Sequence, residues 1–294
     1  MTGMTAARER AIRTSLACLL ALFALGASGC KQAQPQRNPN VSTQQLEAKL
    51  AAKDAEAVNL ARQLGAAADA ALLPYLTAAD AEVRELALDC ADAAGGAQRD
   101  KRLLTALTDA DINVRSLALR HLRRQVDPAS LPALLEQLRA NEDAFVRGEL
   151  ALIIGTLGAT SASDSVARQA TRELDAAAQA NQVLACARLG DKKARGQIRE
   201  ELGHADAQVR LAAVRKYEYI ADASILPDLS GLLHDQAEVF KVSPSHVGNY
   251  TLRLCDVVVL VVARVGQPKL DFDGTQQRRF TPAELQQVET YLRR

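Results

Sequence analysis

The sequence predicts an all-α protein in which helical hairpins stack side by side as an α-α superhelix, a solenoid. The main observation is a short motif, Asp-x-x-Val-Arg, that recurs at nearly constant spacing. Consecutive copies start 31 and 32 residues apart, and a final gap of 63 residues equals two such steps. Units of this length bury their apolar faces against their neighbours, which favours a solenoid. The clear copies are Asp80–Arg84, Asp111–Arg115, Asp143–Arg147 and Asp206–Arg210.

The composition also favours helices over sheets. Hydrophobic residues make up 48% of the chain but aromatic residues only 3%, and much of the apolar content is Ala and Leu. Both residues are strong helix formers. A length of 294 residues is ample for a sizeable core.

The first 29 residues are expected to be a signal peptide rather than part of the fold. Three arginines precede a weakly polar run, Ser15–Gly29, and Cys30 follows it. A membrane-spanning helix needs about 20 apolar residues, so this run is short for a span and fits the apolar region of a signal. The segment Ala27-Ser28-Gly29-Cys30 resembles the lipobox of bacterial lipoproteins, which implies cleavage before Cys30 and lipidation of its thiol. The alternative is an ordinary secretory signal with a chance cysteine.

The lipobox resemblance implies a lipid-anchored protein of the cell envelope. Each buried CH2 of an acyl chain adds about 0.8 kcal/mol, so several chains hold stably where one holds marginally. Lys31 replaces the Asp that retains Gram-negative lipoproteins at the inner membrane. In a Gram-negative source it is compatible with the periplasmic face of the outer membrane. Residues 30–43, rich in Gln, Pro and Asn, are expected to form a flexible tether.

Helical hairpins are expected over residues 44–266. Ser42 and Gln45 have capping-box spacing, which predicts a helix start there. Each repeat opens with a Leu-rich helix, continues through a turn holding the motif's Asp, and closes with a helix rich in Ala and Leu. The Leu-rich segments are Ala71–Leu76, Leu103–Leu107, Leu131–Leu138, Ile198–Leu202 and Ile225–Leu233. Glycines are expected to end three helices, at Gly65, Gly158 and Gly190.

The C-terminal third departs from the regular spacing. A degenerate motif copy, Asn249–Arg253, begins 43 residues after Asp206, which predicts an insertion at about 236–250. The almost wholly apolar segment Leu252–Gly266 is expected to be a buried core helix. Residues 267–294 are expected to cap the last hairpin, with a final helix starting at Thr281, where a capping box recurs.

These features together resemble the HEAT-repeat family, in particular the HEAT-like repeats named from phycobilin lyases. The resemblance covers residues 45–265 and includes the turn Asp, the Val-Arg pair, the Ala-rich second helix and the Leu-Gly that ends it. Leu189–Leu202 closely matches a join between two repeats. The family implies a superhelix of about six or seven hairpins whose second helices line the concave side. It implies no particular activity.

The motif arginines admit a functional and a structural interpretation. They could form a positive ladder for acidic ligands, but in HEAT-like families this arginine bonds a turn Asp or a carbonyl of a neighbouring repeat. We therefore expect a register role for Arg84, Arg115, Arg147, Arg210 and Arg253, with Asp80, Asp111, Asp143 and Asp206 as helix N-caps. One repeat has Asp175 but Gln179 in the arginine's place. That repeat, residues 160–190, is expected to be the weakest joint.

The C-terminal third is also where contacts with a partner are expected. Seven of the ten aromatic residues lie between Tyr217 and Tyr291. Aromatic side chains are favoured at protein interfaces. The alternative is that they pack the irregular last repeat. Three residues of the insertion form the candidate contact set: Phe240, His246 and Tyr250.

The sequence gives no sign of catalysis, metal or cofactor. The four histidines are scattered, no Cys-x-x-Cys occurs, and there is no phosphate loop, serine elbow or dinucleotide fingerprint. Cys90, Cys186 and Cys255 lie two or three repeats apart, too far for disulfides, and are expected to be buried thiols. Removing residues 1–29 takes away three Arg and one Glu, so 36 basic and 35 acidic residues become 33 and 34. This near-neutral charge gives no case for nucleic acid.

The expected function is therefore protein binding by a membrane-tethered scaffold or adaptor without catalytic activity. The alternative is an accessory factor that assists assembly of an envelope complex. An enzyme is the least favoured interpretation.

Overall fold

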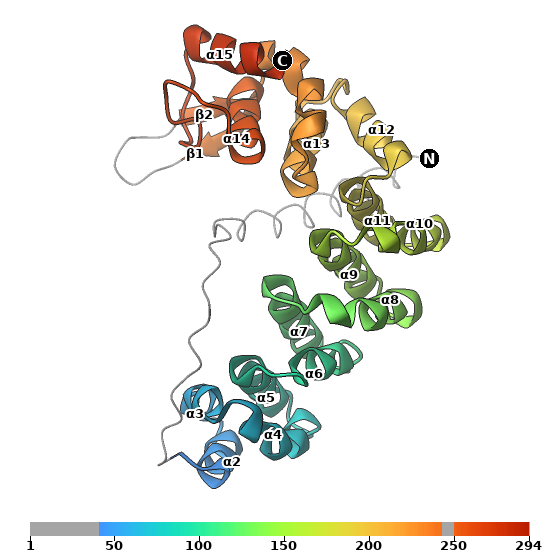
Figure 1. Ribbon diagram of the computed structural model, residues 1–294, viewed down its shortest axis with the longest axis vertical. Helices are drawn as coiled ribbons and strands as arrows, with labels where there is room; N and C mark the ends of the chain where they lie inside the picture. The colour runs from blue at the N-terminus through green and yellow to red at the C-terminus, as the bar shows by residue number, and fades with distance from the viewer. Residues whose placement is uncertain (1–40, 243–249, 294) are drawn as a thin grey trace, which may run out of the picture. The chain divides into compact units, whose positions relative to one another are not determined.

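A computed structural model describes residues 41–242 and 250–293, and nearly all of these residues lie in helices or in the turns between them (Figure 1). The described chain divides into two compact units. The first unit consists of the described residues up to Leu157 together with Arg168–Gln182. The second takes Gly158–Ala167 and the described residues from Val183 onward. The predicted signal peptide, Cys30 and most of the predicted tether lie outside the described residues.

The first unit consists of consecutive helical hairpins. The second helices pack in sequence order, α3 on α5, α5 on α7 and α7 on α9, while α2 packs on α4 and α6 on α8. The prediction of an α-α repeat with neighbours stacked in order is confirmed here. Its elements are α2 (Thr43–Ala51), α3 (Glu56–Leu64), η1 (Gly65–Ala68), α4 (Asp69–Leu76), α5 (Ala81–Ala94), α6 (Arg99–Ala106), α7 (Ile112–Arg124), η2 (Pro128–Ser130), α8 (Leu131–Ala140) and α9 (Ala144–Leu157).

Two helices contain the division between the units. The turn η3 (Thr160–Ala162) leads into α10 (Ser163–Arg172), and α11 (Ala176–Arg188) follows. The chain leaves the first unit after Leu157, re-enters it within α10 and leaves it again within α11. The division therefore falls in the hairpin that has Gln179 in place of the motif arginine.

Local capping explains where the helices begin and end. Ser42 and Gln45 form the expected reciprocal box at α2, and Asp80 accepts a hydrogen bond from the Glu82 N–H at α5. Such caps contribute about 1 kcal/mol each. Two glycines that follow helices, Gly65 and Gly158, have φ of 56° and 69°, a left-handed backbone that side chains disfavour.

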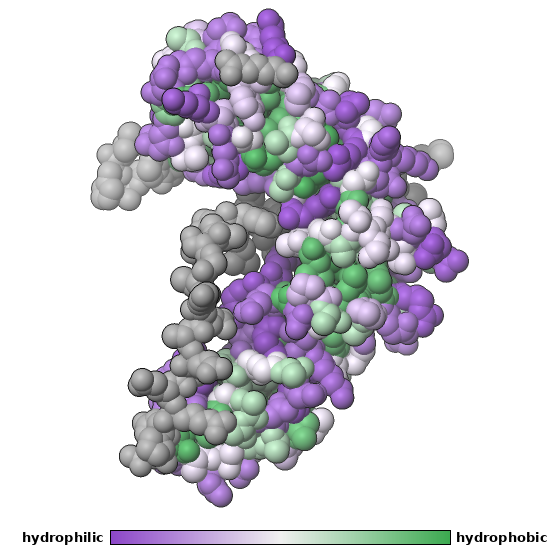
Figure 2. All heavy atoms as spheres, viewed as in Figure 1, coloured by the Kyte–Doolittle hydropathy of each residue, from purple (hydrophilic) through white to green (hydrophobic). Residues whose placement is uncertain are grey.

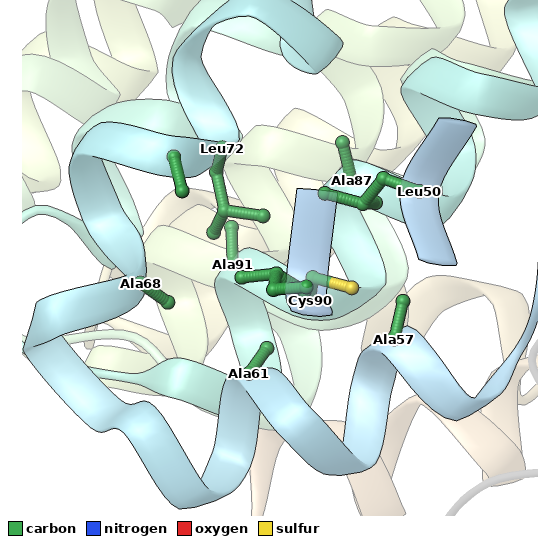
Figure 3. Close-up of a cluster of buried hydrophobic side chains, with 10 residues drawn as sticks. Leu50, Ala57, Ala61, Ala68, Leu72, Ala87, Cys90 and Ala91 are labelled. Atoms are coloured by element: carbon green, nitrogen blue, oxygen red, sulfur yellow. The ribbon is translucent and has the colours of Figure 1, made fainter. Parts of the chain in front are cut away.

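Small apolar side chains form the core of the first hairpins. Figure 3 shows Leu50, Leu72, Ala87 and Cys90 converging from α2, α4 and α5. Each of these four side chains is buried. Alanines on the facing helices leave room for this close approach, as the Ala-rich composition predicted.

The second unit is less regular. Its elements are α12 (Lys192–Glu201), α13 (Ala207–Ile220), η4 (Ala223–His234), β1 (Glu238–Val242), β2 (Tyr250–Arg253), α14 (Leu254–Gly266) and α15 (Pro282–Leu292). The apolar helix α14 is buried along Leu254–Val262 and packs on α13 and η4. Helix α15 packs on η4 and begins with the predicted capping box at Thr281. Within the described residues, no helix combines the length and apolar character needed to cross a membrane.

Two features of this unit differ from the expectation of α-helices throughout. The segment before the insertion, η4, is a 3-10 helix, and Pro227 within it removes one backbone donor. Part of the insertion is an antiparallel pair in which Phe240 lies opposite Leu252, with a bulge between Glu238 and Phe240. Short strands of this kind give little periodicity in a sequence, so the helical pattern missed them.

Candidate functional site

The motif arginines connect consecutive hairpins through two kinds of bond. In the first unit, Arg84 donates from Nε and Nη2 to the Asp109 carboxylate at 2.7 and 2.8 Å. Its Nη1 donates to the carbonyls of Ala78 and Ala79 at 2.7 and 3.0 Å. The guanidinium thus closes the turn of its own hairpin and reaches a carboxylate of the next. Burial alone would raise the pKa of Asp109, but the bonds from Arg84 and from the Asp111 N–H lower it overall.

Three further arginines repeat this geometry. Arg115 donates to Asp143 at 2.9 Å, Arg147 to Glu173 at 2.7 and 2.6 Å, and Arg210 to Asp235 at 2.8 Å. In each case Nη1 also bonds the two carbonyls six and five residues earlier in the chain. These guanidinium groups are satisfied inside the chain, so they offer no free ladder of positive charge.

The acidic acceptors were missed by the sequence analysis. Asp109, Glu173 and Asp235 are not motif residues, and of the motif aspartates only Asp143 accepts from an arginine of the preceding hairpin. The other motif aspartates cap their own helices, as expected. The sequence did contain a signal for these acceptors, because an acidic residue lies 25 to 28 positions after each of these four arginines.

Arg253 differs from the other four arginines. It precedes α14 instead of lying in its first turn, and it bonds Asp256 of that same helix at 2.7 and 2.9 Å. It also donates to the Phe280 carbonyl at 2.7 Å and to the Gln236 side chain at 2.8 Å. Arg253 therefore joins α14 to the capping segment, residues 267–294.

A second buried polar cluster joins α5, α6 and α7. Arg99 donates to Asp92 at 2.6 Å and to the carbonyls of His121 and Gln125, which satisfies the C-terminal end of α7. The imidazole of His121 lies between two carboxylates, with Nε2 at 2.7 Å from Asp89 and Nδ1 at 3.4 Å from Asp92. These side chains bind one another rather than facing an open cleft. No group of three metal-ligating side chains occurs among the described residues.

The three cysteines that the structure describes, Cys90, Cys186 and Cys255, are buried free thiols, as predicted. Burial raises the pKa of Cys90 to about 12 and that of Cys186 to about 11. The thiolate is the reactive form, so neither group is suited to nucleophilic or redox chemistry.

Two residues of the predicted contact set have partners within the chain. Phe240, on β1, lies under the guanidinium of Arg215, with the guanidinium carbon 5.3 Å from the ring centroid. Tyr250, on β2, donates its hydroxyl to the Gln277 carbonyl. His246 lies outside the described residues. The structure thus brings Phe240 to α13 and Tyr250 to the capping segment.

Exposed apolar side chains gather at a different place, which the sequence analysis did not single out. Ile112, Phe145 and Leu174 are 59%, 50% and 98% exposed. They lie at the N-terminal ends of α7 and α9 and just before α11, in three consecutive hairpins of the first unit. We call these three residues the turn edge. Figure 2 shows hydrophobic residues reaching the surface between polar ones.

No family model and no curated protein matches the chain. The chain is similar to a solved structure described as "The structure of the complex of CpcE and CpcF of phycocyanin lyase from Nostoc sp. PCC7120", with 14% identity and a TM-score of 0.45. The similarity covers 90% of this chain and 100% of that one. The described chain has a mostly helical α-α repeat fold.

Proposed function

We propose that this protein is a non-catalytic scaffold that binds a protein partner at the bacterial cell envelope, where a lipid on Cys30 tethers it to the membrane. The observation that carries the binding role is the turn edge. The tether rests on the lipobox resemblance around Cys30.

The turn edge has the properties of a contact surface. Exposed apolar area costs about 25 cal/mol per Å² relative to burial, so large apolar side chains in water favour a partner that covers them. Among the described residues the other exposed large apolar side chain, Leu73, is 53% exposed and lies on α4, whereas the turn edge gathers three such side chains in consecutive hairpins. Capped helices fix their backbones, so little conformational entropy is lost on binding.

Photocrosslinking tests the binding role directly. A photoreactive residue at position 145 in the full-length chain is expected to capture a defined partner in intact cells. The same residue at Lys101, an exposed position on α6, is the matched control. Ile112→Asp, made in the chain with the probe at position 145, should reduce capture at least tenfold without lowering thermal stability. Equal capture at both probe positions, or capture unaffected by Ile112→Asp, would count against the proposal.

The duration of capture separates the scaffold from an assembly factor. A scaffold is expected to crosslink to the same partner throughout growth. Capture confined to newly exported chains of several different proteins would favour the assembly role instead.

The tether is tested by replacing Cys30 with Ser. The wild-type chain is expected to sediment with membranes and to resist salt extraction, because acyl chains bind through apolar burial rather than charge. The Cys30→Ser chain should lose this association. Unchanged fractionation would show that no lipid on Cys30 holds the protein.

A further inference from the structure

Arg215 stands apart from the other arginines of the second unit. Within the described part of that unit, every other arginine donates to a carboxylate or a backbone carbonyl of the chain. Arg215 has neither kind of partner among the described residues. The arginines that bond a carboxylate or a backbone carbonyl are Arg188, Arg195, Arg199, Arg210, Arg253, Arg264, Arg278, Arg279 and Arg293.

The strand pair holds Arg215 against an aromatic ring. Arg215 lies on α13, and Phe240 of β1 places its ring centroid 5.3 Å from the guanidinium carbon. The Gln208 side chain, also on α13, donates to the Val239 carbonyl at 3.3 Å and so fixes β1 beside the helix. A stacked ring stabilises a cation while leaving the N–H groups at the edge of the guanidinium available.

The charge of Arg215 has no close counter-ion within the described chain. The side chain is partly buried, and this burial lowers the pKa of its guanidinium, with Glu218 acting in the opposite direction. The Glu218 carboxylate is already bonded by Arg264 at 2.7 Å. An arginine stays protonated in proteins, so a partly desolvated positive charge is left without a carboxylate in direct contact among the described residues.

We propose that Arg215 is a carboxylate-binding site, which takes an acidic side chain of the protein partner in a two-bond contact while Phe240 holds the guanidinium. The protein origin of the carboxylate rests on the function proposed above; the site itself rests on the geometry of Arg215.

The chemistry favours a carboxylate over other anions. The edge of a guanidinium presents two parallel N–H groups that match the two oxygens of one carboxylate. Lys241 follows Phe240 in β1, and successive side chains of a strand point to opposite faces. Arg215 therefore acts as a single cation, whereas nucleic acids and anionic membranes are bound by several cations together.

Titration of the full-length chain with a small probe tests the site. The peptide acetyl-Gly-Glu-Gly-amide is expected to shift the NMR resonance of the Arg215 Nε–Hε group in a saturable manner. The control peptide acetyl-Gly-Gln-Gly-amide, which lacks the carboxylate, is expected to bind at least about tenfold more weakly. Arg215→Gln should abolish the effect. Arg215→Lys, which keeps the charge without the planar edge, should weaken binding several-fold, as should Phe240→Leu. Arg199→Gln is the control, since Arg199 already bonds Asp228.

The possible results separate the site from the function. Equal binding of both peptides, or peptide binding that survives Arg215→Gln in a folded chain, would overturn the site. Inorganic phosphate or phosphatidylglycerol vesicles that bind as tightly as the Glu peptide would overturn its carboxylate preference. If crosslinking at position 145 captures a partner but the peptide does not bind, the site is wrong and the scaffold stands. If the peptide binds and no partner is captured, the scaffold fails, and with it the protein origin of the carboxylate.

Discussion

Arg147 holds Glu173 by two parallel hydrogen bonds of 2.7 and 2.6 Å across the join between consecutive hairpins. The Glu173 side chain is only 1% exposed, and it also accepts from the Gln182 amide at 3.0 Å. Arg147 in turn bonds the Asn141 and Glu142 carbonyls. This pair is the most enclosed of the motif contacts, so it offers the sharpest tests of their structural role.

Replacing Glu173 with Gln should destabilise the folded chain by about 3 kcal/mol. The change leaves the partly buried Arg147 charge without its partner, and that loss is costly. Urea unfolding followed by circular dichroism measures the effect. Glu142→Gln is the matched control, because Glu142 is exposed and contributes only its backbone carbonyl to the contact. A similar small effect in both variants would mean that the pair adds little to stability.

The same pair predicts a loss of stability in acid. Hydrogen bonds from Arg147 lower the pKa of Glu173 from 4.5 to about 2, although burial opposes the shift. A carboxyl group whose pKa is lowered on folding contributes stability above its unfolded pKa. That contribution should be lost as the pH falls from about 4.5 towards 2, and unfolding free energies over this range measure it. The Glu173→Gln chain should show a shallower dependence on pH, and an unchanged slope would contradict this origin.

Gly148 in α9 should tolerate no larger side chain. A Cβ placed there would lie 3.1 Å from the backbone Cα of Ala178 on α11. Gly148→Ala is therefore expected to cost about 1–3 kcal/mol through overpacking, despite the better helix propensity of Ala. Thermal unfolding measures the change.

Gly196 in α12 is the control for this substitution. A Cβ there would meet no atom within 4 Å, so Gly196→Ala should stabilise the chain by up to about 1 kcal/mol. If both substitutions stabilise, α9 and α11 can separate at no cost and the close approach is unimportant.

Residues 160–190 should exchange their amide protons faster than the hairpins on either side. Gln179 replaces the motif arginine, and its side chain donates to the Ala170 carbonyl within its own hairpin rather than to a carboxylate of the next. At the place in the next repeat that corresponds to Asp109 and Glu173, the chain has His204. Hydrogen exchange read by mass spectrometry tests this, and finding this segment the best protected would refute it.

The three buried cysteines should resist thiol reagents in the folded chain. Burial raises the pKa of all three, and the thiolate is the species that reacts. Maleimide labelling in native buffer is expected to be slow at Cys90, Cys186 and Cys255 and fast in denaturant. Rapid native labelling of any one of them would show that its helix opens readily.

Local signals in the sequence predicted most of the helix boundaries. The capping boxes at Ser42 and Thr281 and the glycine at Gly65 act through residues a few positions away, so they can be read directly. The acceptor of each motif arginine was not identified because it lies in the next hairpin, where only the stacked structure shows which carboxylate is within reach. Arg253 was assigned to the motif because residues 249–253 keep a capping residue, an aliphatic residue and the arginine, yet the strand before α14 gives it a different role.

The candidate contact set shows the same limit. Aromatic content pointed to Phe240 and Tyr250, and both turned out to have contacts inside the chain. What distinguishes Arg215 is that no described residue offers it a carboxylate or carbonyl partner, a property of three-dimensional surroundings that no spacing in a sequence reveals. The turn edge was missed for a related reason. An apolar residue beside a helix cap is usually assigned to the core, and the sequence alone does not show that its side chain is exposed.

The arginine contacts have a consequence for how such a chain can change length during evolution. Four of the motif guanidinium groups reach forward by one hairpin to an acidic acceptor, as Arg84 reaches Asp109 and Arg147 reaches Glu173. Duplication of one whole hairpin that carries both a motif arginine and an acceptor therefore gives each copy of the arginine a carboxylate ahead of it. Gain or loss of a single helix, which is half of a hairpin, would leave one of these arginines without an acidic acceptor.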